Sequence, residues 1–190
     1  NTEYKFFEFT QSSSSTRFGD AFSNSINNKT RFNNFYNKIG LGYKTKNFGS
    51  LNFYVDDNNY NYYYNSLVYD NLGNIVVPNA ISDRINMLGG NYTYFTSNLT
   101  AKIELAQTIS NQSISNVHAM LNYTPNDNIK LEFKYQKLNS LPNLNYTLYQ
   151  SRYVDYNWLN NFKNEKLNQL SFSAFTKWLN TSVQYKVLND

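Results

Sequence analysis

The chain has 190 residues, of which 41% are hydrophobic and 18% aromatic; only 16% are charged, the net charge is +4, and there is no cysteine. The length suits one domain, the aromatic content argues against disorder, and the lack of cysteine excludes disulfide frameworks and thiolate chemistry. No run of about 18 apolar residues is present, so no membrane-spanning helix is predicted, and the basic residues are too scattered for a nucleic-acid-binding tail.

The amino-terminal part of the chain is predicted to form β-strands. Apolar and polar residues alternate weakly over residues 4–10, 16–22 and 32–44, and clearly over 51–55. Successive side chains of a strand point to opposite faces, so alternation predicts strands with one apolar face. Residues 57–80, which are rich in Asn and Tyr, are predicted to form a long loop.

The central part of the chain repeats the pattern. We predict strands over residues 84–95, 99–109, 117–123 and 129–136. The last of these is the clearest, because its two faces separate completely. One face reads Ile129, Leu131, Phe133, Tyr135 and the other Lys130, Glu132, Lys134, Gln136. Strands of this length exceed the typical globular strand of about five or six residues.

The carboxy-terminal part contains a second long loop and two further strands. The loop is predicted over residues 138–165, and the strands over 166–176 and 179–187. Short turns and long loops then alternate along about ten strands. Three of the turns resemble one another, since each has a Thr between an aromatic strand end and an apolar restart; these residues are Thr45, Thr96 and Thr176.

The fold class that this layout favours is all-β, an antiparallel up-and-down transmembrane β-barrel. Outer-membrane barrels have short turns at one end, long loops at the other and an alternating apolar face. Aromatic residues at the predicted strand ends fit the girdles of such barrels; they are Tyr43, Phe48, Tyr94, Phe95, Tyr123, Tyr135, Phe175 and Trp178. The alternative is a soluble antiparallel sandwich, which also alternates apolar and polar residues. We favour the barrel.

The polar side of the predicted strands is the main functional candidate. Charged side chains that line a pore set its ion selectivity. The predicted pore-lining residues are Lys38, Lys102, Glu104, Lys130, Glu132, Lys134 and Lys186. Five lysines against two glutamates give the hypothesis of a weak anion preference. The alternative is that these residues pair across strands or contact a plug.

Catalytic, cofactor and metal sites are not expected. His118 is the only histidine and is interpreted as a lumen-facing or hydrogen-bonded imidazole, although a Ser-His-Asp site stays open as an alternative. The oxygen-rich residues 56–59 are interpreted as turn residues rather than a calcium site. The run Tyr60–Asn65 could stack on sugars, but an aromatic rim is favoured. Gly89-Gly90 indicates a bend or a close approach within a strand.

The chain resembles the putative porin family of Bacteroidetes outer membranes. The segments that carry the resemblance are Phe6-Phe7-Glu8-Phe9-Thr10, Tyr60 to Asn65, Leu141-Pro142-Asn143, Tyr153-Val154-Asp155-Tyr156-Asn157-Trp158, Asn161-Phe162-Lys163-Asn164-Glu165-Lys166 and Trp178-Leu179-Asn180. The resemblance spans most of the chain. It implies a porin-like β-barrel in the bacterial outer membrane, with no established substrate and no catalytic signature.

The expected function is passive or gated passage of small polar solutes or ions. The alternatives are a structural barrel subunit that scaffolds a secretion or uptake complex, and a surface β adhesin. Expected partners are outer-membrane lipid and, through the long loops, other outer-membrane proteins or lipoproteins, but not nucleic acid. We expect residues 1–190 to be one barrel domain or a fragment of a larger barrel, because Asn189-Asp190 is not the aromatic end common among such barrels.

Overall fold

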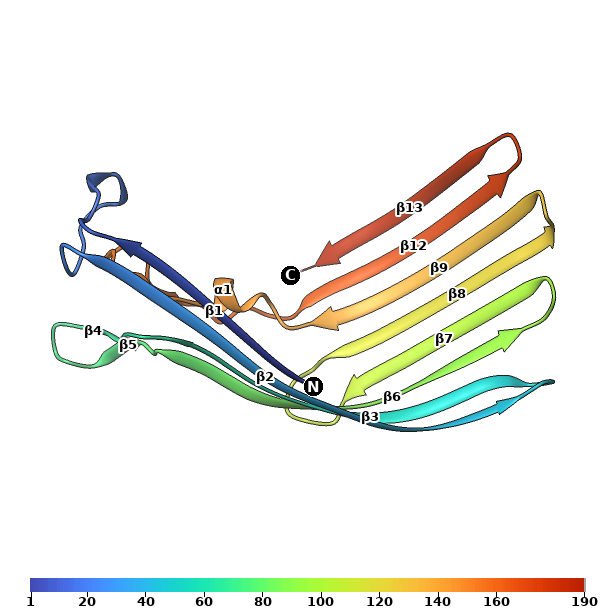
Figure 1. Ribbon diagram of the computed structural model, residues 1–190, viewed down its shortest axis with the longest axis horizontal. Coiled ribbons are helices and arrows are strands. Elements are labelled where there is room, and N and C mark those ends of the chain that lie inside the picture. The colour runs from blue at the N-terminus through green and yellow to red at the C-terminus, as the bar shows by residue number, and fades with distance from the viewer. Residues whose placement is uncertain (190) are drawn as a thin grey trace. The chain divides into compact units, whose positions relative to one another are not determined.

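The computed structural model describes residues 1–189, and most of them belong to one antiparallel sheet (Figure 1). The sheet has nine strands in the order β1-β2-β3-β6-β7-β8-β9-β12-β13. Their bounds are β1 Thr2–Gln11, β2 Ile26–Thr45, β3 Gly49–Tyr64, β6 Ala80–Phe95, β7 Leu99–Thr108, β8 Ser115–Asn126, β9 Ile129–Ser140, β12 Glu165–Thr176 and β13 Asn180–Asn189. Each main strand pairs with the next one along the chain, so the topology is up-and-down.

The remaining elements are short and lie in the connections. Two small hairpins pair β4 (Val68–Tyr69) with β5 (Ile75–Val77) and β10 (Leu148–Tyr149) with β11 (Trp158–Leu159). The helix α1 covers Leu144–Thr147. No helix within residues 1–189 has the length and apolarity needed to cross a membrane.

The prediction of an all-β antiparallel fold is confirmed, whereas a closed barrel is not seen. Within residues 1–189, β1 and β13 are the two ends of the strand order, and no pairing joins them. Nine of the ten predicted strands belong to the sheet. The strand predicted over residues 16–22 is wrong, because Thr16–Phe18 form a short 3-10 helix. Ser15 caps this helix by accepting a hydrogen bond from the Arg17 N–H, and Gly19 ends it with a φ of 79°.

The predicted loops of residues 57–80 and 138–165 begin too early. β3 continues to Tyr64 and β9 to Ser140, so residues 57–64 and 138–140 are strand. Tyr60, Tyr62 and Tyr64 lie on one side of the added part of β3, with Asn61 and Tyr63 on the other. The prediction failed because the residues on this side of β3 change from polar to aromatic within the strand, which obscured a continuing period of two.

The chain divides into two compact units, which are described separately. Unit 1 comprises Asn1–Asn37, Asn58–Arg84 and Pro142–Phe162. Unit 2 comprises Lys38–Asp57, Ile85–Leu141 and the described residues from Lys163 onward. β2, β3 and β6 each contribute one part to each unit, whereas β7, β8, β9, β12 and β13 belong wholly to unit 2.

The three similar turns of unit 2 share one hydrogen-bonding arrangement. The hydroxyl oxygens of Thr45, Thr96 and Thr176 each accept the backbone N–H three residues later, at 2.9 Å, 3.1 Å and 2.9 Å. A Thr or Ser side chain that accepts a nearby backbone N–H stabilises such a turn. The recurring Thr in the sequence therefore marks a recurring local structure, and these hairpin turns gather at one end of the unit 2 strands (Figure 1).

Candidate functional site

Strand register places the predicted pore-lining residues of unit 2 on one face of its sheet. Glu104 lies opposite His118, which lies opposite Gln136. Gln136 lies opposite Gln169, and Gln169 opposite Lys186. Directly opposed residues on antiparallel strands share a face, so these five side chains form a row across β7, β8, β9, β12 and β13.

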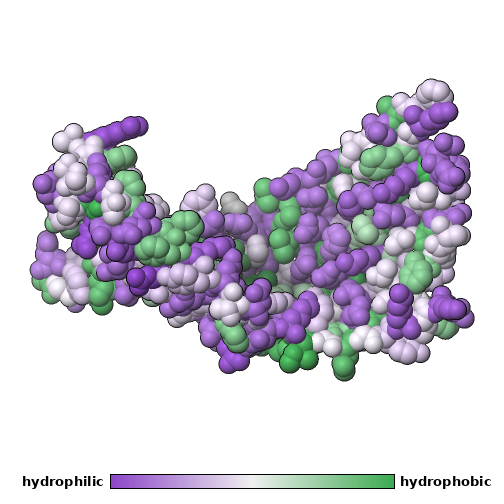
Figure 2. All heavy atoms as spheres, viewed as in Figure 1, coloured by the Kyte–Doolittle hydropathy of each residue, from purple (hydrophilic) through white to green (hydrophobic). Residues whose placement is uncertain are grey.

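The remaining predicted residues of unit 2 lie on the same face in neighbouring rows. Lys102 lies opposite Met120, and Met120 opposite Lys134, while Glu132 occupies the next position on the same face of β9. Lys130 follows on that face, opposite Phe175 of β12. We call this side of unit 2 the polar face. Figure 2 shows mainly hydrophilic side chains on the side of unit 2 turned toward the viewer.

Lys38 joins the polar face through contacts with two residues of β3. Its Nζ lies 3.3 Å from the centroid of the Tyr54 ring and 3.7 Å from Asp56 Oδ1. The Tyr54 hydroxyl donates to Glu104 Oε1 at 3.4 Å. All seven predicted residues therefore lie on one face, although whether that face lines a pore stays a prediction. The contacts of Tyr54 and Asp56 with Lys38 were not predicted, because alternation gives the face of a residue but not the register between two strands.

Tyr54 is buried because it covers a glycine on β6. A Cβ atom added at Gly89 would lie 2.4 Å from Tyr54 Cζ, so only glycine leaves room for the ring. The ring is 7% exposed in consequence. The predicted close approach at Gly89-Gly90 is confirmed, since the Tyr54 side chain is what approaches.

Three of the five lysines have carboxylate partners on the same face. Lys102 Nζ lies 3.4 Å from Glu104 Oε2 and Lys134 Nζ 2.5 Å from Glu132 Oε1, while Lys38 has Asp56. Lys130 instead lies over the Phe175 ring, 5.6 Å from its centroid. Within residues 1–189, Lys130 and Lys186 have no carboxylate at ion-pair distance. The alternative that the predicted pore-lining residues form ion pairs therefore holds for three of the five lysines.

The other sequence candidates take ordinary positions. Residues 56–59 lie in the middle of β3, so the prediction that they form a turn is wrong. Their side chains alternate between faces and do not converge on one point. No group of three or more His, Asp or Glu side chains that could hold a metal occurs in the part of the chain that the structure describes. His118 lies on the polar face, directly opposite Glu104.

The opposite face of unit 2 is apolar and exposed. Ile39 is 78% exposed, Leu41 82% and Val183 68%. Among the described residues, the buried apolar side chains of unit 2 are Tyr54 and Ile85, whereas unit 1 buries Ile26, Tyr62, Val77 and others. A sheet with a broad exposed apolar face and scarcely any core is unlike a soluble domain. We call this side the apolar face.

The odd-numbered residues of β2 and β3 change character where these strands pass from one unit to the other. In unit 2 they are mainly apolar on both strands, up to the charged Asp57 at the boundary on β3; the apolar ones are Ile39, Leu41, Tyr43, Leu51, Phe53 and Val55. In unit 1 they are mainly polar or charged: Lys29, Arg31, Asn33, Asn59 and Asn61. The even-numbered residues of β3 change in the reverse sense, from mainly polar residues with Tyr54 among them, ending at Asn58, to Tyr60, Tyr62 and Tyr64. This change of polarity can be read from the sequence, but it was not among the predictions made from it.

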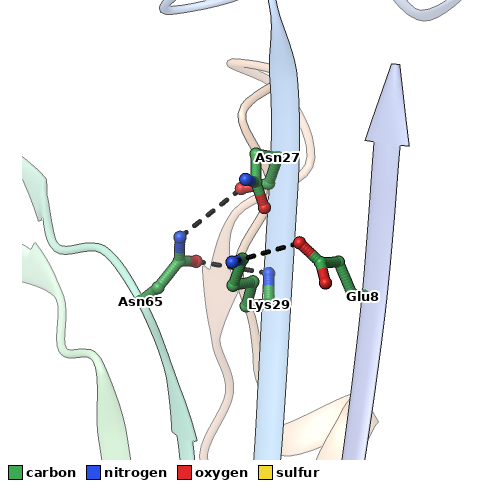
Figure 3. Close-up of polar contacts among 4 residues, drawn as sticks. All are labelled: Glu8, Asn27, Lys29 and Asn65. Atoms are coloured by element: carbon green, nitrogen blue, oxygen red, sulfur yellow. Dashed lines mark hydrogen bonds and ion pairs between the residues drawn. The ribbon is translucent and has the colours of Figure 1, made fainter.

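On the charged side of unit 1, polar contacts join neighbouring strands. Lys29 Nζ lies 3.1 Å from Glu8 Oε1 of β1, and the Lys29 N–H donates to Asn65 Oδ1 at 3.3 Å (Figure 3). Asn65 Nδ2 in turn donates to the Asn27 carbonyl at 3.5 Å. These contacts join β1, β2 and the residue that follows β3. This side of unit 1 therefore has the ion pairs and amide contacts of a water-facing surface.

The other side of unit 1 is an aromatic core. Tyr62, Tyr64, Val77 and Leu148 form a buried cluster against which Phe32 packs. The Tyr62 and Tyr64 hydroxyl oxygens lie 2.6 Å apart. Burial raises the pKa of both hydroxyl groups, and for Tyr62 the hydrogen bond with Tyr64 adds to the increase. The prediction that Tyr60–Asn65 forms a rim is wrong, because three of these tyrosines are core residues.

A cavity of about 1050 Å³ lies beside this core, within unit 1. Its lining includes Phe7 and Phe9 of β1, Tyr62 of β3, Tyr149 of β10 and Trp158 of β11. Short strands and α1, all within the predicted loop 138–165, bring the last two rings into place. The cavity could not be predicted from the sequence, because it depends on contacts between segments far apart in the chain.

Fold and site together define a class of protein: an up-and-down antiparallel sheet with an exposed apolar face and a charged polar face. The family model described as "Putative porin" matches residues 1–190. The chain therefore belongs to this porin family, which confirms the resemblance seen in the sequence. No curated protein and no solved structure matches the chain.

Proposed function

We propose that the chain forms part of the wall of an outer-membrane β-barrel, and that its polar face lines a passive or gated passage for small polar solutes or ions. The family is porin-like, and the apolar face of unit 2 suits contact with lipid. Charged and amide side chains on the opposite face suit a water-filled interior. We assign no catalytic role to the chain.

The observation that carries this proposal is the change of polarity along β2 and β3. An apolar band on the outside and polar residues on the inside are typical of a membrane barrel. A polar outside and an aromatic inside are typical of a protein domain in water. β2 and β3 each have the first pattern in unit 2 and the second pattern in unit 1. We infer that each strand leaves the hydrocarbon layer where the pattern changes, near Asn37 on β2 and Asp57 on β3.

The height of the apolar band supports the same proposal. On β7 the band runs from Leu99 to Leu105, which is about 20 Å at roughly 3.3 Å per residue. The apolar band of outer-membrane barrels is about 25 Å tall. At the turn end of unit 2, Tyr43 and Trp178 are 72% and 87% exposed, as residues of an aromatic girdle would be. Unit 1, which contains the long connections, would lie outside the bilayer.

Single-cysteine spin labels test the membrane boundary, and the native chain has no cysteine to interfere. Labels at Ile39 and Leu41 should be relaxed mainly by oxygen, which dissolves in lipid. Labels at Lys29 and Arg31, on the same side of the strand, should be relaxed mainly by a water-soluble nickel chelate. Equal access of the nickel chelate to all four positions in vesicles would refute the proposed lipid contact.

Conductance distinguishes a passage from a scaffold. The protein in planar bilayers should give discrete ion-conducting steps if the polar face lines an open pore. A scaffold subunit would show the same lipid contact, no conductance, and purification in a stoichiometric complex with partner proteins. A protein that stays soluble without detergent would favour the adhesin instead.

A further inference from the structure

We infer that the aromatic cavity of unit 1 is a binding site for a neutral oligosaccharide. The cavity lies wholly within unit 1 and has a volume of about 1050 Å³. Small-ligand sites are typically of about 300–1,000 Å³ and are lined by aromatic side chains with a few placed polar groups. This inference is independent of conductance, and either proposal can fail without the other.

The aromatic wall is fixed before any ligand arrives. The Tyr149 and Trp158 rings stack with their centroids 4.6 Å apart and an angle of 20° between planes. Trp158 Nε1 donates to the Asn145 carbonyl at 3.2 Å, which sets the orientation of the indole. Phe18 packs against Tyr153 with centroids 5.3 Å apart. A wall held by ring contacts and hydrogen bonds loses little entropy when a ligand binds.

β1 presents open ring faces to the same cavity. Phe7 and Phe9 line it and are 65% and 53% exposed, so their rings are available to a ligand. The neighbouring Phe6 belongs to the opposite face of β1, where Arg31 lies 5.6 Å from its ring centroid. The strand therefore offers two aromatic platforms on the cavity side and a matched phenylalanine outside the cavity.

The polar groups at the cavity favour a ligand that has hydroxyls and no charge. Asn143 Oδ1 accepts the Asn145 N–H, and Asn145 Oδ1 accepts the Tyr62 hydroxyl. Neither amide Nδ2 has an acceptor within residues 1–189, so both can donate to a ligand. The two charged residues that line the cavity both have ion-pair partners: Lys5 Nζ lies 2.8 Å from Glu3 Oε1, and Glu8 Oε1 lies 3.1 Å from Lys29 Nζ.

Saccharides combine the features that this wall would recognise. The C–H faces of a pyranose ring can lie on aromatic rings, whose faces carry negative partial charge. Sugar hydroxyls accept hydrogen bonds from side-chain amides. A hydrocarbon chain would leave the amides without acceptors, and a charged ligand would find no unpaired countercharge. The sequence left open that the run Tyr60–Asn65 stacks on sugars. The structure indicates where such stacking would occur, at the cavity wall beside Tyr62.

Trp158 provides the readout for the test. The chain has two tryptophans, so Trp178→Phe, at an exposed turn of unit 2, leaves Trp158 as the only indole. The full chain should be kept in a detergent without a sugar head group. We expect neutral hexasaccharides to change the Trp158 fluorescence saturably, while a uronic acid oligomer and a fatty acid at equal concentrations do not.

Substitutions on the two faces of β1 supply the control. Phe7→Ala and Phe9→Ala should each weaken oligosaccharide binding at least fivefold, whereas Phe6→Ala should leave it within twofold. Circular dichroism and heat-modifiable migration check that all three variants fold alike. The inference is overturned if no neutral oligosaccharide binds, if affinity follows acyl-chain length or ligand charge, or if Phe6→Ala weakens binding as much as Phe7→Ala.

Discussion

The ammonium group of Lys38 lies over the ring of Tyr54, 3.3 Å from the ring centroid, while the hydroxyl of the same tyrosine donates to Glu104. One side chain of β3 thus links a cation on β2 to a carboxylate on β7. The Lys38 side chain is 44% exposed, and a solvent-exposed cation over a ring contributes about 0.5–1 kcal/mol. This contact organises the part of the polar face where β2, β3, β6 and β7 are neighbours.

Substitution of Gly89 should displace Tyr54. An alanine Cβ would lie 2.4 Å from Tyr54 Cζ, and overpacking of this kind costs about 1–3 kcal/mol. We expect Gly89→Ala to lower the free energy of unfolding by that amount in urea titrations of vesicle-embedded protein. In a Tyr54→Ala background the same substitution should cost little. Equal costs in both backgrounds would show that the two residues are not coupled.

Charge on the apolar face should be far more costly than charge on the polar face. Val183 and Gln184 are neighbours on β13 and point to opposite faces. An arginine on the lipid side of a barrel costs about 2–4 kcal/mol near the bilayer midplane. Val183→Arg should therefore reduce the folded fraction seen by heat-modifiable migration, while Gln184→Arg should not. Similar losses for both variants would contradict the assignment of the faces.

Ion selectivity should depend on Lys130 and Lys186. On the polar face five lysines face Asp56, Glu104 and Glu132, and these two lysines have no carboxylate partner within residues 1–189. We expect a weak anion preference that the double variant Lys130→Gln, Lys186→Gln reduces or reverses, measured as the reversal potential in a salt gradient. Lys177→Gln, at the β12–β13 turn, makes a similar charge change elsewhere and should have little effect. A cation-selective native channel would refute this prediction.

The threonine turns should each contribute measurably to stability. In Thr96→Val the side chain loses the oxygen that accepts the Leu99 N–H at 3.1 Å. A single hydrogen bond of this type contributes about 1 kcal/mol. We expect faster amide exchange at Leu99 and a loss of about that size in the free energy of unfolding. Thr96→Ser keeps the hydroxyl and serves as the control; if it is equally destabilised, the hydroxyl is not the cause.

Alkaline pH should weaken unit 1 before unit 2. Burial raises the pKa of Tyr62 and Tyr64 above that of a free tyrosine, which is about 10. Below pH 10 both hydroxyls are protonated in the folded and unfolded chain, so their contribution is complete. Above pH 10 the unfolded chain loses these protons and the folded chain keeps them, so stability falls as pH rises.

The slope of stability against pH between 10 and 11 measures this effect. In Tyr62→Phe one of the two buried groups is absent, so the slope should be smaller. Absorbance of tyrosinate should show exposed tyrosines ionising first and the buried pair only on unfolding. An unchanged slope in the variant would mean that Tyr62 does not contribute.

Strand positions and faces were predictable where one rule holds along a whole strand. Lys130, Glu132 and Lys134 share a face because alternation on β9 is complete, and the Thr turns repeat a local pattern. The pairing of Lys38 with Asp56 was not predictable, since it depends on the register between β2 and β3. The strand predicted over residues 16–22 was wrong because the Ser15 cap and the positive φ of Gly19 favour a short 3-10 helix over a strand. The cavity of unit 1 needs long-range contacts that no local pattern encodes.

The polarity change along β2 and β3 also restricts how these strands can pair. A slip by one residue turns every side chain of a strand to the other side. On β2 such a slip would bring Ile39 and Leu41 to the polar face of unit 2 and, at the same time, Lys29 and Arg31 into the aromatic core of unit 1. Both errors come from one shift, so the surroundings of the apolar face and the aromatic core of unit 1 independently select the same alignment. Misaligned hairpins would therefore be rejected even when only one of the two surroundings has formed.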